Sequence, residues 1–450
     1  MRRSKACMRS QVLRAPGSGP GRVMDGRGCR GAGTASGASW RAWRCAPRRG
    51  QYSRARSGRS ARAILRRRRT APLDRALLLA LLVFASIFSY GVFGPLIPEI
   101  GRTMALSDWQ LGILAGSYGL ARMLMALPAG WFADRYLGAS LAAAPVAFAA
   151  GVVVLATAPA FPLLVLGRFL MGLGHTLTFV GGFTALVRDV GDARVSTRLN
   201  VFESGSMLGV LGGLAVVGAL PVEWGWRRSF LVGSSPILLG LALAPVLVRL
   251  FRGAAGRVAA GAPRAEGAPV AESTRMLVLV FVAGSLYPMI WTAVGQFLLP
   301  LRATREFGLD RAGISRLYGL AQAVDLAALL PIGRLADRFG VGVLGAVTLL
   351  FGLASILVSL GPYPWVVAGC ALYGLGLTGW VLPVGTIRRL TPPGRVGARL
   401  GLYRLLGDGA AFLGPLVCGL LGSEGAGWLV AGCGMVGILA GLALLAAAPP

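Results

Sequence analysis

Apolar residues along this chain gather in runs of about 20 residues instead of alternating with polar ones. A helix that crosses about 30 Å of hydrocarbon needs about 20 mostly apolar residues, and its backbone satisfies its own hydrogen bonds in lipid. The pattern therefore predicts an all-α membrane protein. Twelve transmembrane helices are expected, at 76–99, 109–132, 139–158, 161–187, 199–220, 228–250, 276–300, 312–332, 342–361, 364–387, 399–421 and 426–448.

The predicted spans are joined by short connections, with one exception. The stretch LFRGAAGRVAAGAPRAEGAPVAESTR, between the sixth and seventh spans, is rich in Gly, Ala, Pro and Arg and is typical of a flexible linker. It divides the spans into six and six. The predicted domains are a tail at 1–74, a first six-helix bundle at 75–250, a cytoplasmic linker at 251–274 and a second six-helix bundle at 275–450.

Composition supports a membrane protein, because 55% of the 450 residues are hydrophobic and only 14% are charged. The net charge of +29 raises the alternative of a nucleic-acid-binding protein, but residues 1–75 hold 20 Arg and one Lys against two Asp. This tail lacks hydrophobic periodicity and aromatic residues spaced to stack on bases. We expect no nucleic-acid partner. The tail itself is a disordered or non-native segment, a basic functional arm or an organellar transit peptide.

Arginines also predict the orientation of the spans. The stretch ILRRRRT at 64–70 precedes the first span and places that end in the cytoplasm by the positive-inside rule. With this orientation the inner connections carry fifteen arginines and the outer ones six. We therefore expect a multi-pass protein of the cytoplasmic (plasma) membrane with both termini inside.

A short charged motif occurs twice, as GWFADRYLG at 130–138 and as GRLADRFG at 333–340. We call these stretches the loop motifs. Other pieces repeat at nearly the same offset of about 202 residues: MGLGHT with YGLGLT, and RLNVFESGSMLGVLGG with RLGLYRLLGDGAAFLGP. The offset indicates a duplicated six-helix unit. Because six is even, the two repeats enter the membrane from the same side, related by a pseudo-two-fold axis along the membrane normal.

These motifs resemble those of the major facilitator superfamily over residues 75 to 450. The second loop motif matches the family pattern Gly-x-Leu-Ala-Asp-Arg-x-Gly, and the first has one residue inserted before its last Gly. Both lack the basic pair that usually follows, and the Gly-Pro of proton antiporters is absent from the fifth span, where Leu214 follows Gly213. The matching positions are Gly333, Leu335, Ala336, Asp337, Arg338 and Gly340; Gly130, Ala133, Asp134 and Arg135; and Arg168, Gly172 and Gly174 in the fourth span.

The resemblance implies that the loop motifs join the two halves on the cytoplasmic side when the outside is open. Small residues, Gly130 and Gly333, would allow close helix approach. The acidic residues would face the amino-terminal end of a helix in the other half, and the arginines would pair with inner carboxylates. The alternative is that these turns only anchor loops among lipid headgroups. The expected gating residues are Gly130, Asp134, Arg135, Gly333, Asp337 and Arg338.

Ionisable residues inside spans indicate mechanism, because each costs about 2.5 to 3.5 kcal/mol at mid-bilayer unless it is paired or hydrated. Asp325 is the principal candidate to carry a proton, with pairing to another helix as the alternative. For the other ionisable residues inside spans the alternative is a structural role, such as an ion pair between Arg404 and Asp408, which lie four residues apart on one helix. The candidates for proton coupling are Asp325, Arg168, Glu203 and Asp408.

The family resemblance places the substrate pathway between the halves, lined by the first, fourth, seventh and tenth spans. Aromatic and amide side chains there suit a moderately apolar, planar compound, or a cation held on ring faces. The alternative is that they pack or anchor at the membrane interface. The candidate cavity residues are Tyr90, His175, Thr178, Tyr287, Trp291, Gln296 and Trp380.

We predict proton-coupled export of drug-like or metabolite compounds by alternating access. Uptake of an organic anion or sugar is the alternative within transport, and a non-transporting membrane sensor is the alternative from another class. An enzyme is not expected, because His175 is the only histidine and no phosphate-binding or nucleophile motif occurs. We expect no metal and no cofactor; the expected partners are a small-molecule substrate, protons and the lipid bilayer, for a functional monomer.

Overall fold

The helices described below belong, apart from Gly58 at the start of the first one, to one compact unit, Arg59–Pro450. Every regular element in the described part of the chain is helical, which confirms the all-α prediction. The computed structural model describes residues 58–188, 195–251, 274–392 and 395–447.

The predicted tail and linker are largely outside the described residues, which omit 1–57 and 252–273. One part differs from the expectation. Residues 58–74, assigned to the tail, are the beginning of the first helix. Ala, Leu and Arg, which are frequent there, are among the best helix formers, so the helix starts before the apolar run.

The elements before the linker are called the first half and those after it the second half. The first half comprises α1 Gly58–Thr103, α2 Asp108–Thr157, α3 Phe161–Arg188, α4 Val195–Ala219, η2 Val222–Trp224, α5 Gly225–Gly233 and α6 Ile237–Phe251. The second half comprises α7 Thr274–Ala293, the π-helical η3 Val294–Leu298, α8 Leu299–Arg305, α9 Arg311–Phe339, α10 Val341–Leu360, α11 Tyr363–Leu377, η4 Thr378–Val381, α12 Leu382–Arg389 and α13 Val396–Ala446.

Ten helical stretches in the described ranges are long and apolar enough to cross a membrane. Two of them, α2 and α13, have 50 and 51 residues, about 75 Å of helix and more than twice the hydrocarbon thickness. Each is interrupted, α2 at Tyr136 and α13 at Gly422, whose φ of 72° is a left-handed conformation that favours glycine. A division at both positions is consistent with twelve spans, although twelve spans and two repeats stay predictions.

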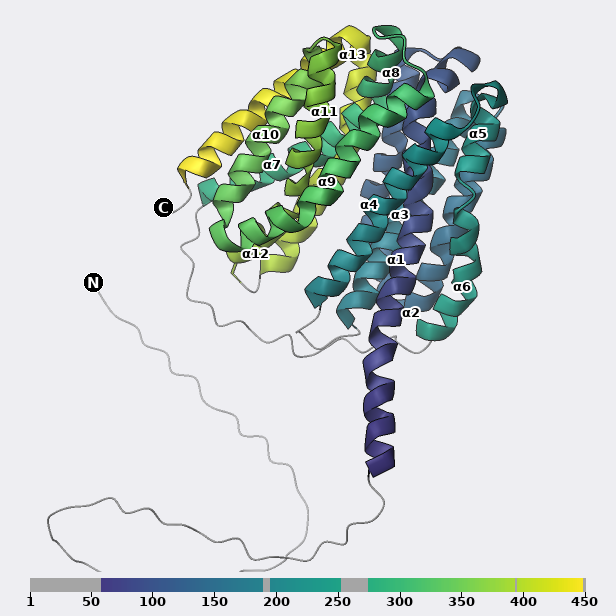
Figure 1. Cartoon of the computed structure of the whole chain (residues 1–450), viewed down its shortest axis with the longest axis vertical. Helices are drawn as coiled ribbons and strands as arrows, with labels where there is room; N and C mark the ends of the chain where they lie inside the picture. Colours follow the sequence, from purple (N-terminus) through teal and green to yellow (C-terminus); the bar gives the residue numbers. More distant parts are fainter. Residues whose placement is uncertain (1–57, 189–194, 252–273, 393–394, 448–450) are drawn as a thin grey trace, which may run out of the picture. The chain divides into compact units, whose positions relative to one another are not determined.

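Among the helix pairs that join the halves, α2 packs on α13, and α4 packs on α9. Within the first half, α2 contacts α3 and α6; within the second, α13 contacts α7 and α10. Figure 1 shows these helices of the second unit running side by side, with their connections gathered at two ends. The end with the connection between α8 and α9 is the predicted outer end, and the end with the loop motifs is the predicted inner end.

Glycines set the distance between α2 and α13. A Cβ added to Gly112 would lie 2.5 Å from the carbonyl oxygen of Pro415, and one added to Gly116 would lie 2.7 Å from that of Phe412. Gly119, one turn further along, is equally close to the backbone of Phe412. Small residues let helix backbones approach closely in membranes, where lipid offers no hydrophobic drive to associate. The contact between the halves therefore depends on these glycines.

We predict that Gly116→Ala destabilises the protein although alanine is the better helix former. The new methyl group meets a backbone oxygen that cannot rotate away, and such overpacking costs about 1 to 3 kcal/mol. Gly432→Ala, on the exposed face of α13 where a Cβ meets nothing within 4 Å, is the matched control and should keep or raise stability. Thermal unfolding of both variants in detergent measures this, and an unchanged midpoint for Gly116→Ala would contradict it.

Candidate functional site

At the predicted outer end, a buried arginine joins the halves. Arg311, at the start of α9, donates to both carboxylate oxygens of Glu99 on α1, at 2.7 and 2.6 Å. It also donates to the carbonyl oxygens of Pro221 and Val222 and to the hydroxyl of Ser229. One fully buried guanidinium side chain thus connects α9 with α1, with the segment after α4 and with α5.

A second ion pair lies at the same end. Arg305 of α8 donates to both oxygens of Asp108 on α2, at 2.9 and 2.6 Å. Local capping positions the partners: Gln110 accepts from the backbone N–H of Ser107 at the start of α2, and Asp310 accepts from that of Gly313 at the start of α9. Bidentate arginine–carboxylate pairs are strong and geometrically specific. The halves are therefore held together at this end.

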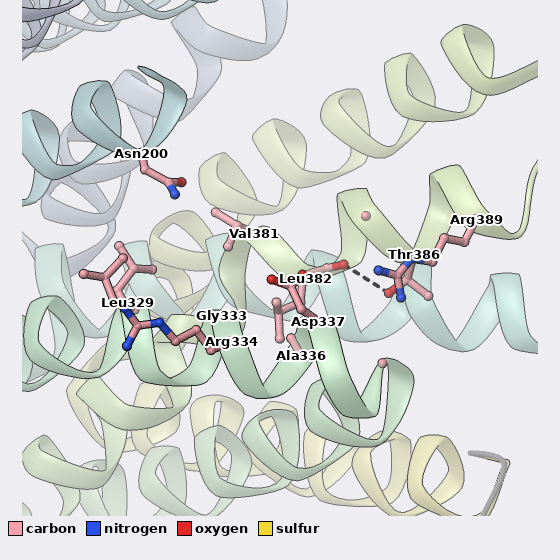
Figure 2. Close-up of a pocket in the computed structure, with 13 residues that line it drawn as sticks. Asn200, Leu329, Gly333, Arg334, Ala336, Asp337, Val381, Leu382, Thr386 and Arg389 are labelled. Atoms are coloured by element: carbon pink, nitrogen blue, oxygen red, sulfur yellow. Dashed lines mark hydrogen bonds between the residues drawn. The ribbon is translucent and has the colours of Figure 1, made fainter. Parts of the chain in front are cut away.

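The predicted inner end differs, because a cavity of about 460 Å³ lies there between the halves. Figure 2 shows Asn200 of α4 on one side and Leu329 and Arg334 of α9 on the other. Gly333 and Asp337, from the second loop motif, also line the cavity.

The first glycine of each loop motif makes no close helix contact in this conformation. A Cβ on Gly130 or Gly333 would meet nothing within 4 Å, so neither lies at a close helix contact. Asp337 and Arg338 are exposed and form no salt bridge with another residue of the described ranges. Asp134 and Arg135 are exposed as well, with the Arg135 guanidinium 5.6 Å from the Trp131 ring. Their gating role stays a prediction.

Between the two ends, a buried ion pair connects the halves through Arg122 of α2, which donates to Asp408 of α13. Both residues are buried. Arg404 lies on the same helix as Asp408, with its Nε 3.4 Å from Oδ2 of the carboxylate. Asp408 thus has two cationic neighbours, of which Arg122 was not expected as a partner. The two residues are 286 positions apart, and only the packing of α2 on α13 brings them together.

Two more carboxylates lie near this pair. Glu203 of α4 is close enough to Arg404 and Arg122 for their charges to act on it, and the charge of Glu203 acts in turn on Asp325 of α9. Asp325 is 3% exposed, and its Oδ1 has no hydrogen-bond partner in the described part of the chain. The structure therefore places Glu203 and Asp408 near the two arginines, and Asp325 near Glu203.

Arg168 of α3 lies outside that group. It is fully buried, and its Nη2 donates to Oε1 of Gln296 at 3.1 Å. Its guanidinium carbon is 3.7 Å from the centre of the Phe93 ring and 4.9 Å from that of Tyr118. Gln296 belongs to the π-helical η3 of the other half, and such turns are frequent at functional sites.

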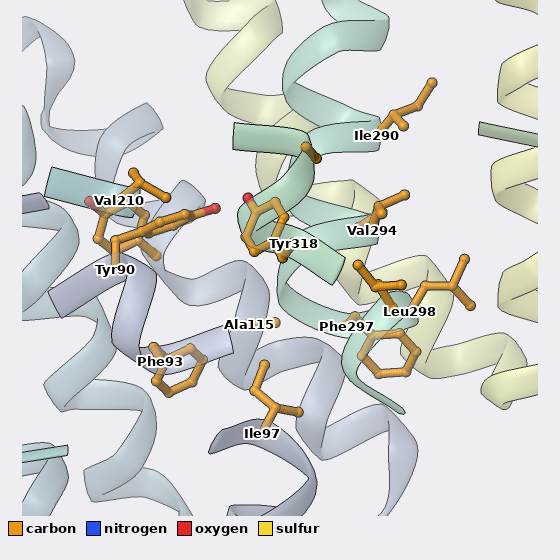
Figure 3. Close-up of a cluster of buried hydrophobic side chains, with 14 of the residues drawn as sticks. Tyr90, Phe93, Ile97, Ala115, Val210, Ile290, Val294, Phe297, Leu298 and Tyr318 are labelled. Atoms are coloured by element: carbon orange, nitrogen blue, oxygen red, sulfur yellow. The ribbon is translucent and has the colours of Figure 1, made fainter. Parts of the chain in front are cut away.

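Aromatic rings continue from Arg168 across the boundary between the halves. Tyr90 of α1 stacks on Trp291 of α7 with centroids 4.6 Å apart and planes 10° apart, and Trp291 meets Trp380 at 5.5 Å. Figure 3 shows Tyr90 and Phe93 on α1 facing Tyr318 of α9, with the hydroxyls of Tyr90 and Tyr318 turned toward each other. Both tryptophans are half-buried, so this region combines ring faces with partial exposure.

The remaining predicted cavity residues pack within one half. Tyr287 bonds to the hydroxyl of Thr348, 3.0 Å away, and stacks on Phe351. Thr178 donates to the carbonyl oxygen of Gly174 in its own helix. His175 stacks on Phe179 with centroids 4.2 Å apart, and its Nδ1 has no partner among the described residues.

Sequence reasoning missed both outer ion pairs, although it counted the arginines of the outer connections. A usable signal existed, because two acidic residues, Glu99 and Asp108, flank the first outer connection and two arginines, Arg305 and Arg311, flank a later one. Phe93 and Tyr118, which contact Arg168, carried no signal of their own in a chain with so many buried aromatic residues.

Comparison with known proteins decides the family. The Major Facilitator Superfamily model matches residues 79–315 and 276–450. The chain belongs to the Major Facilitator Superfamily. This membership confirms the resemblance drawn from the loop motifs, and it points to a transporter rather than an enzyme and to an integral multi-pass membrane protein.

The relatives of this chain include transporters that are named for different substrates. Polyol transporter 5 of Arabidopsis thaliana is 30% identical over 163 residues, 34% of this chain and 29% of that protein. The multidrug resistance protein B homolog of Mycobacterium tuberculosis is 32% identical over 160 residues, 35% of this chain and 29% of that protein. The chain thus spans less than a third of either relative. An uncharacterized MFS-type transporter of Enterobacter sp. (strain 638) is 27% identical over 293 residues, 62% of this chain and 69% of that protein.

Solved structures share the fold. A peptide transporter POT in complex with sulfate has a TM-score of 0.66 at 18% identity and covers 83% of this chain and 94% of its own. The nucleoside transporter NupG has a TM-score of 0.63 at 14% identity and covers 82% of this chain and 99% of its own. At these identities the likeness describes the arrangement of helices alone.

We predict that Asp408→Asn lowers stability strongly, since it leaves the buried Arg122 without its ion-pair partner. Removing one partner of a buried pair costs about 3 to 5 kcal/mol, whereas removing both costs less. The double variant Arg122→Gln with Asp408→Asn should therefore recover part of the loss. Thermal unfolding of the singles and the double in detergent gives the coupling energy.

The matched control is Glu306→Gln. It removes an exposed carboxylate from Arg302 of α8, whose guanidinium still donates to the carbonyl oxygens of Val358 and Gly361, so stability should change by less than about 1 kcal/mol. Additive losses in the Arg122 and Asp408 variants would contradict the assigned coupling.

Proposed function

We propose that this superfamily member is a secondary active transporter that moves a small organic molecule by alternating access. The observation that carries the proposal is the difference between the two ends. Two bidentate ion pairs, Arg311 with Glu99 and Arg305 with Asp108, join the halves at one end. At the other end a cavity of about 460 Å³ lies along the second half, with Asn200 of the first half in its wall. If the two halves rock against each other, the closed end and the open end of such a pathway would exchange.

The transport is coupled to protons in this proposal. A carboxylate is costly inside a membrane unless it is paired, and Asp325 has an oxygen without a partner among the described residues. A proton on this carboxyl would remove that cost. Glu203, on the facing helix, and Asp408 lie in the same group of charges, so a proton gained or lost by one changes the field at the others.

Export of a drug-like or metabolite compound is the direction we favour, supported by the multidrug resistance relative. Uptake of an organic anion or sugar is the second candidate, supported by the polyol transporter relative and by the unpaired Arg168. The proposed location is the cytoplasmic membrane, with both termini inside and the monomer as the working unit.

We predict that cells expressing the full chain accumulate one compound of a cationic, neutral and anionic panel differently from empty cells, and that an uncoupler abolishes the difference. Lowered accumulation means export and raised accumulation means uptake. Asp325→Asn should remove the effect, because an amide carries no exchangeable charge. Glu306→Gln, a carboxylate lost from the exposed outer end, is the control and should retain it. Transport that Asp325→Asn leaves intact would refute its coupling role, and no effect across the panel would favour the sensor.

The closed outer end yields a further prediction. Glu99→Gln together with Asp108→Asn weakens both outer ion pairs, so the population open at the inner end should fall. A cysteine at position 200, in the cavity wall, reports this in full-length protein whose six native cysteines are replaced by alanine. Its alkylation by N-ethylmaleimide in detergent should become severalfold slower. Equal rates with and without the two substitutions would show that these pairs do not hold the conformation.

A further inference from the structure

Arg168 is a buried charge without a counter-charge among the residues that the structure describes. Its side chain is fully buried, and only Nη2 has an acceptor, the neutral amide oxygen of Gln296. Nε and Nη1 have no hydrogen-bond partner in the part of the chain that the structure describes. Arg122, which is also buried, differs because it forms an ion pair with Asp408. An unpaired buried charge costs several kcal/mol, so Arg168 calls for an explanation.

The carboxylates of the membrane interior do not supply the missing charge. Glu203 lies within the field of Arg404 and Arg122, and Asp325 within that of Glu203. The ionisable groups that act on Arg168 are the phenols of Tyr118 and Tyr90. These hydroxyls are neutral donors and lack hydrogen-bond partners of their own among the described residues. The surroundings of Arg168 thus contain hydrogen-bond donors in excess and no described anion.

Aromatic side chains surround the guanidinium group of Arg168. Phe93 lies 3.7 Å from the guanidinium carbon and packs on one face of the group. The stacked rings of Tyr90 and Trp291 come from different halves, and the guanidinium carbon is 5.8 Å from the centre of the Tyr90 ring. Any rocking of the halves separates these two rings and exposes two parallel ring faces beside the charge. Trp380 continues the aromatic wall next to Trp291.

We propose that Arg168 binds the carboxylate of an aromatic acid substrate, whose ring stacks on Tyr90 and Trp291. The inference rests on the proposed transport function and names its substrate class. Charge-assisted hydrogen bonds from Nε and Nη1 would hold the carboxylate, and the unpartnered Nε2 of Gln296 is a further donor on the opposite half. A cation would meet the like charge of Arg168, and a sugar would leave that charge uncompensated.

The site also couples binding to the two halves. Arg168 and Tyr90 belong to the first half, and Gln296 and Trp291 belong to the second. A carboxylate that replaces Gln296 as the acceptor of Nη2 would release a hydrogen bond between the halves. A substrate anion would therefore affect the contact between the halves directly, as a transported ligand must.

The test compares aromatic carboxylates with their primary amides, which keep the ring and lose the charge. The probes are benzoate, 4-hydroxybenzoate and indole-3-carboxylate, each with its amide, added to the purified full chain in nanodiscs. Binding is measured as the concentration-dependent shift of the thermal midpoint. At least one carboxylate should bind about tenfold or more tightly than its amide, because charged hydrogen bonds are roughly twice as strong as neutral ones.

Two variants locate the effect. Arg168→Gln should abolish the preference for the carboxylate, and Arg168→Lys, which retains the charge but not the planar fork, should keep part of it. If Arg168→Gln does not fold, the preference for the carboxylate over its amide is compared between the wild type and Arg168→Lys, and a lower preference in Arg168→Lys supports the proposal. The proposal is overturned if no carboxylate binds, if amides bind equally, or if the preference survives in Arg168→Gln.

Failure of this inference is distinguishable from failure of the transport function. Uncoupler-sensitive transport of a neutral or cationic compound, with no binding of the aromatic acids, overturns the substrate class and leaves the transporter intact. Carboxylate binding that needs Arg168, in a protein that moves no compound of the panel, supports the ligand site and refutes transport.

Discussion

The compensation of charge in the membrane interior is the constraint on which the rest of this structure depends. Hydrocarbon cannot solvate a guanidinium, so each buried arginine must find an acceptor in the protein or receive one from outside. Arg122 finds Asp408 and Arg311 finds Glu99, both in the opposite half. The two halves are therefore linked in part through charges that neither half satisfies alone, and motion between them would change the partners of these charges.

The contacts between the two halves are distributed unevenly between the two ends of the helical bundle. Bidentate ion pairs join the halves at the predicted outer end, while the second loop motif, at the predicted inner end, lines a cavity. Glycines on α2 bring α13 close enough for the buried pair to form. Close helix packing and ion pairing thus act together, because a guanidinium reaches a carboxylate only if the backbones are near.

Two kinds of buried charge coexist at mid-depth. The group around Asp408 contains three carboxylates and two arginines, so one carboxylate exceeds the available positive charge, which suits the proposed proton exchange. Arg168 has ring faces and neutral donors instead, which suits an anion from outside. In the mechanism proposed above, the proton and the substrate would bind at separate positions that share the boundary between the halves. Each would then influence the same movement between the halves.

The sequence by itself determined the helical membrane class, most span positions and the family, because apolar run length and the repeated loop motifs are local properties of the chain. It also identified Arg168, Glu203, Asp325 and Asp408 as the charges to examine, since any ionisable residue in an apolar run stands out. Only the tertiary structure decided which of them are paired. Pairing depends on contacts between helices distant in sequence, such as the 286 positions that separate Arg122 from Asp408, and no local pattern encodes that distance.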